Sequence, residues 1–281
     1  MPDACILLIE GTNCEEETKR AFEAVGIEAE LVHLKQLTGD CSKDRKRNLF
    51  DYRVLMLPGG WSAGDYVRAG AIFAARIKSR LFDDIKEFVE SGNLIFGICN
   101  GFQILTEMGL LPGFNGILKE PISSLTNNLT SNFQCRPTYL RHVNKCHFTS
   151  KLKIGNVLQI PVAHAEGRFT FGKKDKELLD RLIENGQIVF RYCYENGEYA
   201  NDKFPWNPNG SLYDIAGICN PEGNILGMMP HPERVIYKIQ ESDWTREHEG
   251  KKNRVRNKTN WEDYGDGRII FESIADYLKK F

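Results

Sequence analysis

Long hydrophobic runs are missing from this chain of 281 residues: none approaches the roughly 20 apolar residues that a membrane-spanning helix needs. An excess of either charge is missing too, since the formal net charge is -1 and acidic and basic residues are mixed along the chain. The net charge therefore gives no overall electrostatic attraction to nucleic acid or to an anionic membrane. The start, MPDACILLIEG, is too short and too acidic for a signal peptide. These features predict a soluble, cytoplasmic protein without a nucleic-acid or membrane partner.

Paired cysteines are also missing. The 8 cysteines form no C-x-x-C pair and no His-Cys cluster at metal-ligand spacing. A chain of this length buries enough core to fold without disulfide bonds. It has no Walker A loop, G-x-x-x-x-G-K-[ST], for nucleotide phosphates. The sequence therefore predicts reduced thiols, no metal site and no cofactor in this chain.

Apolar runs alternate with amphipathic segments in the first hundred residues. The runs ACILLIE, EAELVHL, YRVLMLPGG and NLIFGIC, at 4–10, 28–34, 52–60 and 93–99, are typical of strands buried in a parallel sheet. Helical spacing is present at 15–25 and 80–92. This order predicts an α/β fold with an open, mostly parallel sheet, helices on both faces, and ligands beyond the carboxyl ends of the strands.

The second half predicts an antiparallel extension of that sheet. Short strand patterns separated by Gly, Asn and Pro stand at 138–143, 155–164, 187–194, 213–220 and 224–233, with a turn at 220–224. An amphipathic helix is expected at 269–281. The chain has no internal repeat and no linker, so one domain over 1–281 is predicted. A charged insertion at about 239–268 is either a solvated loop or a contact with a partner or a phosphate.

A cysteine stands between two glycines in FGICNGFQIL, at 96–105. The pattern G-x-C-x-G is formed by Gly97-Ile98-Cys99-Asn100-Gly101, which stands between a predicted strand and a predicted helix. It is the thiol counterpart of the nucleophile elbow G-x-S-x-G. The helix N-terminus favours a thiolate over a thiol. The backbone N–H of Asn100 is placed to hold an oxyanion. A structural cysteine remains the alternative for the bare pattern, but the strand-turn-helix context favours a nucleophile.

A thiolate nucleophile needs a base, and the base needs an acceptor that orients it. His231 follows an apolar strand in MMPHPER, and Glu233 stands two residues later, which puts both side chains on one side of an extended segment. The alternative is that His231 and Glu233 are an exposed His-Glu pair in a loop, without a catalytic role. His164 in PVAHAEGRF, with Glu166 at the same spacing, is a competing base that the sequence does not exclude.

Three motifs carry a family resemblance. LPGG, GICNGFQIL and MPHPE resemble the signatures of class I glutamine amidotransferases, which have a flavodoxin-like fold and a Cys-His-Glu triad. Within that class, LPGGWSAGDYVRAGAI, NFQCRPTYL, PVAHAEGRF and DIAGICNPEGNILGMMPHPER are similar to the glutaminase subunits of phosphoribosylformylglycinamidine synthase in purine biosynthesis. The similarity runs from about residue 6 to 235 and resumes over the last helix, so it covers nearly the whole chain.

The resemblance implies hydrolysis of glutamine to glutamate and ammonia through a thioester. The implied catalytic residues are Cys99, His231 and Glu233; the implied oxyanion donors are the backbone of Gly59, Gly60 and Asn100; and the implied substrate-binding residues are Gln103, Asn132 and Phe133. Asp65, Tyr66 and Arg68 are expected at the pocket mouth, at an interface or in a structural salt bridge. His164 and Glu166 could belong to the ammonia path or to an interface.

The resemblance also implies partners. A separate synthetase subunit would bind ATP, magnesium and formylglycinamide ribonucleotide and use the ammonia to make formylglycinamidine ribonucleotide, and a small subunit would bridge the two. The free chain is expected to be a poor glutaminase. Three rivals remain: an amidotransferase of a histidine or pyrimidine pathway, a flavodoxin-like cysteine hydrolase or chaperone, and a noncatalytic regulatory module.

Overall fold

The computed structural model describes residues 2–117, 120–242, 244 and 263–280. Most of the charged insertion predicted at 239–268 lies outside the described residues. Within the described part, no helix has the length and apolar character required to cross a membrane. The cysteines are free thiols.

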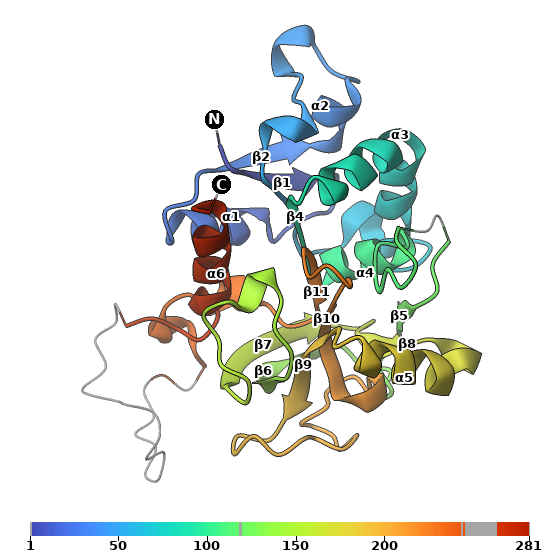
Figure 1. The fold of residues 1–281 in the computed structure, drawn as a ribbon, viewed down its shortest axis with the longest axis vertical. Coiled ribbons are helices and arrows are strands. Elements are labelled where there is room, and N and C mark those ends of the chain that lie inside the picture. Colours follow the sequence, from blue (N-terminus) through green and yellow to red (C-terminus); the bar gives the residue numbers. More distant parts are fainter. Residues whose placement is uncertain (1, 118–119, 243, 245–262, 281) are drawn as a thin grey trace.

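A nine-stranded sheet in the order β2-β1-β3-β4-β11-β10-β9-β6-β7 forms the centre of the fold (Figure 1). Its first five strands run parallel to one another. They are β2 (Ala29–His33), β1 (Ala4–Leu8), β3 (Val54–Leu57), β4 (Leu94–Ile98) and β11 (Ile225–Met228). All five residues of β4 and all four of β3 are buried, which is why these runs are continuously apolar rather than alternating.

The other four strands form the predicted antiparallel extension. They are β10 (Ile215–Cys219), β9 (Ile188–Cys193), β6 (Gln134–His142) and β7 (Val157–His164). The strand patterns in both halves are thus confirmed, with one difference. The last strand, β11, was expected in the extension, but it pairs parallel with β4 and antiparallel with β10 and so joins the two halves. A small separate sheet pairs β5 (Ser124–Thr126) with β8 (Arg168–Thr170).

Helices cover both faces of the parallel half, as predicted (Figure 1). On one face lie α1 (Glu15–Glu23) and α6 (Arg268–Leu278), whose Phe22 and Phe271 rings meet edge to face at 5.1 Å. On the other lie α3 (Ala71–Glu90) and α4 (Asn100–Glu107). Helix α3 begins nine residues before the predicted start because Phe73, Ala74 and Ile77 continue its buried stripe.

Two further helices were not predicted: α2 (Leu34–Thr38) and α5 (Asp175–Glu184). Short 3₁₀ turns join the described elements: η1 (Lys43–Arg45), η2 (Leu49–Asp51), η3 (Ser62–Asp65), η4 (His147–Thr149), η5 (Gly172–Lys174), η6 (Leu212–Asp214), η7 (Pro232–Arg234) and η8 (Lys238–Gln240). The carboxyl ends of β1, β3, β4 and β11 meet at one edge of the sheet. The loops that follow these strands carry the residues described next.

Candidate active site

Cys99 occupies the sharp turn between β4 and α4. Its backbone has φ 51° and ψ -107°, a left-handed conformation that costs a non-glycine residue about 1–3 kcal/mol. The surrounding packing must supply that energy, and the turn holds the Cys99 side chain where strand and helix separate. The geometry is that of a nucleophile elbow, as the G-x-C-x-G pattern predicts.

The two flanking glycines are required by close packing. A Cβ on Gly101 would lie 1.9 Å from the carbonyl oxygen of Leu57, because α4 begins directly against the end of β3. A Cβ on Gly97 would lie 2.6 Å from the carbonyl oxygen of Gly101. Real Cβ atoms do not approach so closely, so only glycine lets the strand and the helix meet at this angle.

His231 and Glu233 form a buried pair after β11. His231 Nδ1 lies 2.6 Å from Glu233 Oε1, and both residues are only 1% exposed. The exposed-loop alternative for this pair is therefore wrong. Because β11 is the parallel neighbour of β4, the two turns that follow these strands bring residues 231 and 99 to the same place.

The electrostatics of this pair favour a charged imidazole. Burial alone would lower the pKa of His231. The negative charge of Glu233 and the neighbouring thiols outweigh burial, so the pKa lies well above its ordinary value. Its Nε2 is buried and has no hydrogen-bond partner among the described residues. This nitrogen is therefore available to a reacting group.

The sulfur of Cys99 lies beside this imidazole. It contributes to raising the pKa of His231, and it also lies 3.6 Å from the carbonyl oxygen of Ala163 on β7. A Cβ added to Gly59 would lie 2.9 Å from Cε1 of His231 and 3.5 Å from Cβ of Cys99. Gly59 therefore packs between the predicted nucleophile and the predicted base.

The predicted oxyanion donors surround the elbow. Asn100 is the first residue of α4, so its N–H belongs to the first helical turn, where N–H groups lack intrahelical acceptors. Its side chain accepts from Ser62 Oγ at 2.6 Å and donates to Gln103 Oε1 at 3.0 Å. These bonds tie the Gly59-Gly60 loop, which continues into η3, to the start of α4.

A pocket opens in front of Cys99, and the predicted substrate residues lie around it unequally. Gln103 and Phe133 line the pocket together with Cys99 and His231. Gln103 is buried, and its Nε2 donates to the carbonyl oxygen of Glu166 at 2.6 Å. Asn132 is exposed and does not line this pocket; its carbonyl oxygen accepts from Asn128.

His164, the competing base, lines the same pocket but is held differently. Its Nδ1 lies 3.2 Å from Asn128 Oδ1, and its Nε2 lies 3.4 Å from Asn209 Nδ2. Burial, reinforced by the charge of His231, lowers the pKa of His164 to about 3. The carboxylate of Glu166 accepts from the Ala69 N–H instead of orienting His164. The geometry therefore favours His231 as the base.

Asp65 is a pocket residue whose position the sequence left open. Burial and, to a lesser extent, the charge of Glu166 raise the pKa of Asp65, while the Gly70 N–H and the Asn100 amide partly offset them. The resulting pKa is about 6. Arg68 instead forms an ion pair with Glu107, with an Nε to Oε1 distance of 2.6 Å, and Tyr66 is 90% exposed. Of these three, Asp65 alone lines the pocket in front of Cys99.

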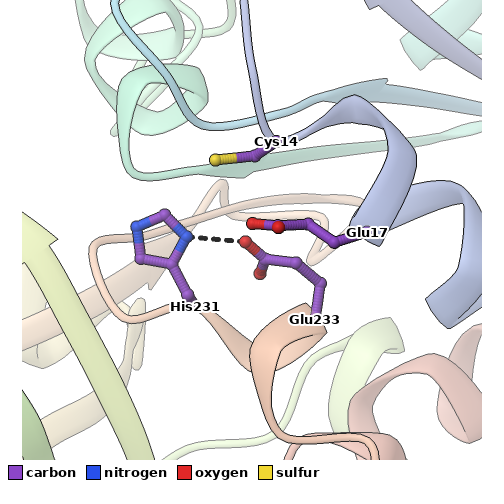
Figure 2. A group of neighbouring side chains, drawn as sticks. All are labelled: Cys14, Glu17, His231 and Glu233. Carbon is purple, nitrogen blue, oxygen red and sulfur yellow. Dashed lines mark hydrogen bonds and ion pairs between the residues drawn. The ribbon is translucent and has the colours of Figure 1, made fainter.

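Cys14 is a pocket residue that the sequence patterns did not reveal. This buried thiol immediately precedes α1 and also lines the pocket. Figure 2 shows it above the His231–Glu233 pair, with Glu17 of α1 alongside. One ligand-type atom from each of these four residues lies within 4.8 Å of the others, so they are the candidate metal ligands of the described chain. Positions 14 and 231 are too distant in sequence for spacing to reveal the group.

Comparisons with known proteins agree with this geometry. Residues 1–278 match the family of the CobB/CobQ-like glutamine amidotransferase domain. The phosphoribosylformylglycinamidine synthase subunit PurQ of Archaeoglobus fulgidus is 50% identical, over 98% of this chain and 96% of that protein. The PurQ subunit of Picrophilus torridus is also 50% identical, over 85% of this chain and 89% of its own length. A chain in the structure of PurLQS from Thermotoga maritima is 33% identical with a TM-score of 0.69, over 99% of both chains.

Proposed function

Because this chain belongs to the PurQ family of glutamine amidotransferases, we propose that it is the glutaminase subunit of a phosphoribosylformylglycinamidine synthase and that Cys99, His231 and Glu233 are its catalytic triad. The observation that carries the assignment of residues is the strained elbow of Cys99 beside a buried His231–Glu233 pair. A thiol, an imidazole and an orienting carboxylate are the parts that a covalent acyl transfer needs.

In the first half-reaction the thiolate of Cys99 attacks the side-chain amide carbon of glutamine. The C–N double-bond character is lost and the carbonyl oxygen becomes an oxyanion. Backbone N–H groups of Asn100 and of the Gly59-Gly60 loop stabilise this charge. His231 then gives a proton from Nε2 to the departing nitrogen, and the C–N bond breaks. Ammonia departs, and a γ-glutamyl thioester remains on Cys99.

In the second half-reaction water replaces ammonia. His231, now neutral, takes a proton from water through the same Nε2, and the hydroxide attacks the thioester carbon. Collapse of this second oxyanion breaks the C–S bond and releases glutamate and the thiolate of Cys99. Throughout, Glu233 accepts from Nδ1 and so keeps Nε2 directed at the reacting atoms.

The pocket also contains groups for the two ends of glutamine. The carboxylate of Asp65 offers a charged partner to the substrate ammonium group. Gln103 retains one N–H of its amide beyond the bond to Glu166, and Phe133 closes the mouth by stacking on Trp61, with ring centroids 6.2 Å apart. Asn132 lies outside the pocket lining, so a role for it in substrate binding requires movement of its loop.

Ammonia must reach an acceptor before water protonates it, so a protected route is needed. We assign the acceptor chemistry to a separate synthetase subunit that binds ATP, magnesium and formylglycinamide ribonucleotide, with a small subunit bridging the two. The similarity to a chain of PurLQS from Thermotoga maritima supports such an assembly. Trp61, Tyr66, Val67 and Phe133 are exposed apolar side chains of the kind that a partner surface covers.

This chain needs no cofactor of its own for the chemistry proposed, since thiolate, imidazole and backbone amides supply each step. We place the reaction in the cytoplasm, where the thiol of Cys99 stays reduced. The free chain is expected to hydrolyse glutamine slowly until its partners order the pocket.

The decisive experiment measures glutamate release by the chain alone and by its complex with the synthetase subunit, together with ammonia-dependent formation of formylglycinamidine ribonucleotide. We expect glutamate release to rise in the complex and to be lost in Cys99→Ala. Free ammonia should still support product formation in the Cys99→Ala complex. Undiminished glutamate from Cys99→Ala would exclude the mechanism, and equal rates with and without the synthetase would exclude activation by the partner.

A further inference from the structure

Cys14, Glu17, His231 and Glu233 surround one point beside the proposed triad (Figure 2). Cys14 and Glu17 come from the start of α1, whereas His231 and Glu233 come from the turn after β11. One sulfur, one imidazole nitrogen and two carboxylate oxygens of this group lie within 4.8 Å of one another. These are ligand types that Zn²⁺ prefers.

The spacing is close to that of a tetrahedral zinc site. Zinc bonds of about 2.0–2.3 Å place neighbouring ligand atoms roughly 3.3–3.8 Å apart. Ligand atoms that lie as far as 4.8 Å apart must therefore approach one another by about 1–1.5 Å, while the distance of 2.6 Å between His231 Nδ1 and Glu233 Oε1 must widen. Glu17 is half-exposed, so its side chain has room to adjust toward the metal.

A second observation points to a cation site. Oε2 of Glu233 is fully buried and has no hydrogen-bond partner among the described residues. Burying a carboxylate oxygen without a partner is costly, and a second carboxylate, Glu17, lies beside it. Arg234 is a neighbouring cation, but its guanidinium contacts Glu17 Oε1 at 2.7 Å and Cys14 Sγ at 3.2 Å rather than this oxygen.

The charges balance with a divalent ion in place. Two carboxylates and the Cys14 thiolate carry three negative charges, and one Zn²⁺ with Arg234 carries three positive charges. Binding replaces two protons, one on the Cys14 thiol and one on Nδ1 of His231. Arg234 keeps its N–H bonds to Cys14 and Glu17 and orients both ligands, as outer-shell donors do in known metal sites.

From this geometry we propose that Cys14, Glu17, His231 and Glu233 form an inhibitory Zn²⁺ site that reversibly switches off the triad. The metal takes Nδ1, the nitrogen that faces Glu233 in Figure 2. The remaining proton of the neutral ring then resides on Nε2. A ring with metal on one nitrogen and a proton on the other accepts no further proton, so His231 no longer serves as a base toward Cys99 or water.

The test uses the full chain, freed of metal with a chelator and titrated with Co²⁺ as a spectroscopic probe for Zn²⁺. Thiolate coordination produces a near-ultraviolet sulfur-to-cobalt charge-transfer band. We expect this band at one equivalent of Co²⁺ in the wild-type chain and in Cys99→Ala, its disappearance on adding Zn²⁺, and its loss in Cys14→Ser. Cys135→Ser, which removes an exposed thiol, is the matched control and should keep the band.

Glu17→Gln provides a variant with little risk to folding, since Glu17 is half-exposed on α1. It should weaken metal binding at least about tenfold, the lower end of the loss seen when groups around a metal are removed. Zinc should inhibit glutamate release by the wild-type complex, a chelator should restore it, and Glu17→Gln should need at least about ten times more zinc. Inhibition of the triad rests on the proposed function, but cobalt binding does not depend on glutaminase activity. The cobalt titration therefore tests the metal site even if the proposed function is wrong.

Two outcomes overturn the proposal. A band that persists in Cys14→Ser and disappears in Cys99→Ala would place the metal on the nucleophile instead. The absence of any charge-transfer band in the wild-type chain, with Co²⁺ in excess, would show that these residues do not hold a thiolate-ligated metal.

Discussion

Nδ1 of His231 lies 2.6 Å from Oε1 of Glu233, and the two side chains are almost completely buried. Because the carboxylate accepts from Nδ1, the imidazole presents Nε2 to the side of Cys99. The arrangement fixes the ring in one orientation and stabilises the imidazolium that forms during catalysis. The predicted extended segment is wrong, because the 3₁₀ turn η7 begins immediately after position 231. This turn, rather than strand alternation, brings the carboxylate of Glu233 back to Nδ1 of His231.

Glu233→Gln should reduce the rate and change its pH dependence. The negative charge of Glu233 outweighs burial and raises the pKa of His231, so the imidazolium that protonates the leaving ammonia persists to higher pH. Without that charge the pKa falls, and the alkaline limb of kcat/KM moves to lower pH. We expect a loss of about 100-fold or more in kcat. Glutamate release measured across pH checks this, and an unchanged alkaline limb would contradict it.

Substitution of the two pocket histidines should have unequal effects. His231→Ala removes the proposed acid and base and should reduce glutamate release by about 100-fold or more. His164→Gln should cost less than about tenfold, because His164 is neutral at the pH of the assay and both ring nitrogens face asparagine amides. Steady-state kinetics of both variants with the same synthetase partner make the comparison. Equal losses would restore His164 as a candidate base.

Much of the fold was predictable because its strands are buried on both faces. Continuous apolar runs mark β1, β3 and β4 directly, and the glycines at 97 and 101 mark the elbow because a side chain there has no room. Position 231 was predictable from the proline-flanked motif after an apolar strand. Its pairing with Cys99 depends on β11 lying next to β4, which local patterns do not encode.

The remaining site residues are set by contacts between distant segments. Cys14 meets His231 only because α1 begins beside η7, and its own surroundings in sequence resemble an ordinary helix start. Asp65 enters the pocket through a left-handed backbone at φ 51°, which the sequence SAGD does not specify.

Helix α5 was not predicted, although its sequence DKELLDRLIE is amphipathic and so typical of a helix. Only Leu182 of this helix is fully buried, so its apolar stripe is short.

Gly101→Ala should destabilise the protein more than a glycine substitution in open space. The added Cβ would lie 1.9 Å from the carbonyl oxygen of Leu57, which forces α4 away from β3 and should cost about 3 kcal/mol. Gly26→Ala is the control. Gly26 has φ +81°, but an added Cβ there would meet no described atom within 4 Å apart from its chain neighbours, so the substitution should cost about 1 kcal/mol from backbone strain alone. Urea denaturation of both variants measures the difference. Equal losses in the free energy of unfolding would show that α4 and β3 move apart and relieve the steric clash at little cost.

Asp65→Asn should change the pH dependence of stability. The folded-state pKa of Asp65 is raised from 3.8 to about 6, so the folded protein binds more protons than the unfolded chain in this window. Wild-type stability therefore falls as pH rises from about 4 to 6, and the asparagine variant lacks this loss. Relative to wild type, the variant should gain about 1–2 kcal/mol between about pH 4 and 7, allowing for partial solvent screening. Urea titrations at the two pH values test this, and a constant difference would contradict it.

The same substitution should weaken glutamine binding at neutral pH. If the carboxylate holds the substrate ammonium group, its loss should raise KM about tenfold, or roughly 1.4 kcal/mol, with a smaller effect on kcat. Wild-type KM should rise as pH falls below about 6, where Asp65 takes up its proton, and this rise should be absent from the variant. A proportional loss of kcat with unchanged KM would instead indicate that Asp65 acts by positioning Asn100, whose amide lies 3.4 Å away.

An electrophilic glutamine analogue, such as a chloroketone, should alkylate Cys99 in preference to the second pocket thiol, Cys14. Cys99 lies at the start of α4 beside Nε2 of His231, which has no hydrogen-bond partner in the described part of the chain. Burial raises the pKa of the Cys14 thiol and keeps it protonated. Mass spectrometry of the digested protein should locate one adduct on Cys99, protected by glutamine. The adduct should persist in Cys14→Ser and disappear in Cys99→Ala. Both thiols lie beside the same imidazole. If Cys14 were labelled in the wild-type chain and glutamine protected it, Cys14 rather than Cys99 would be the nucleophile.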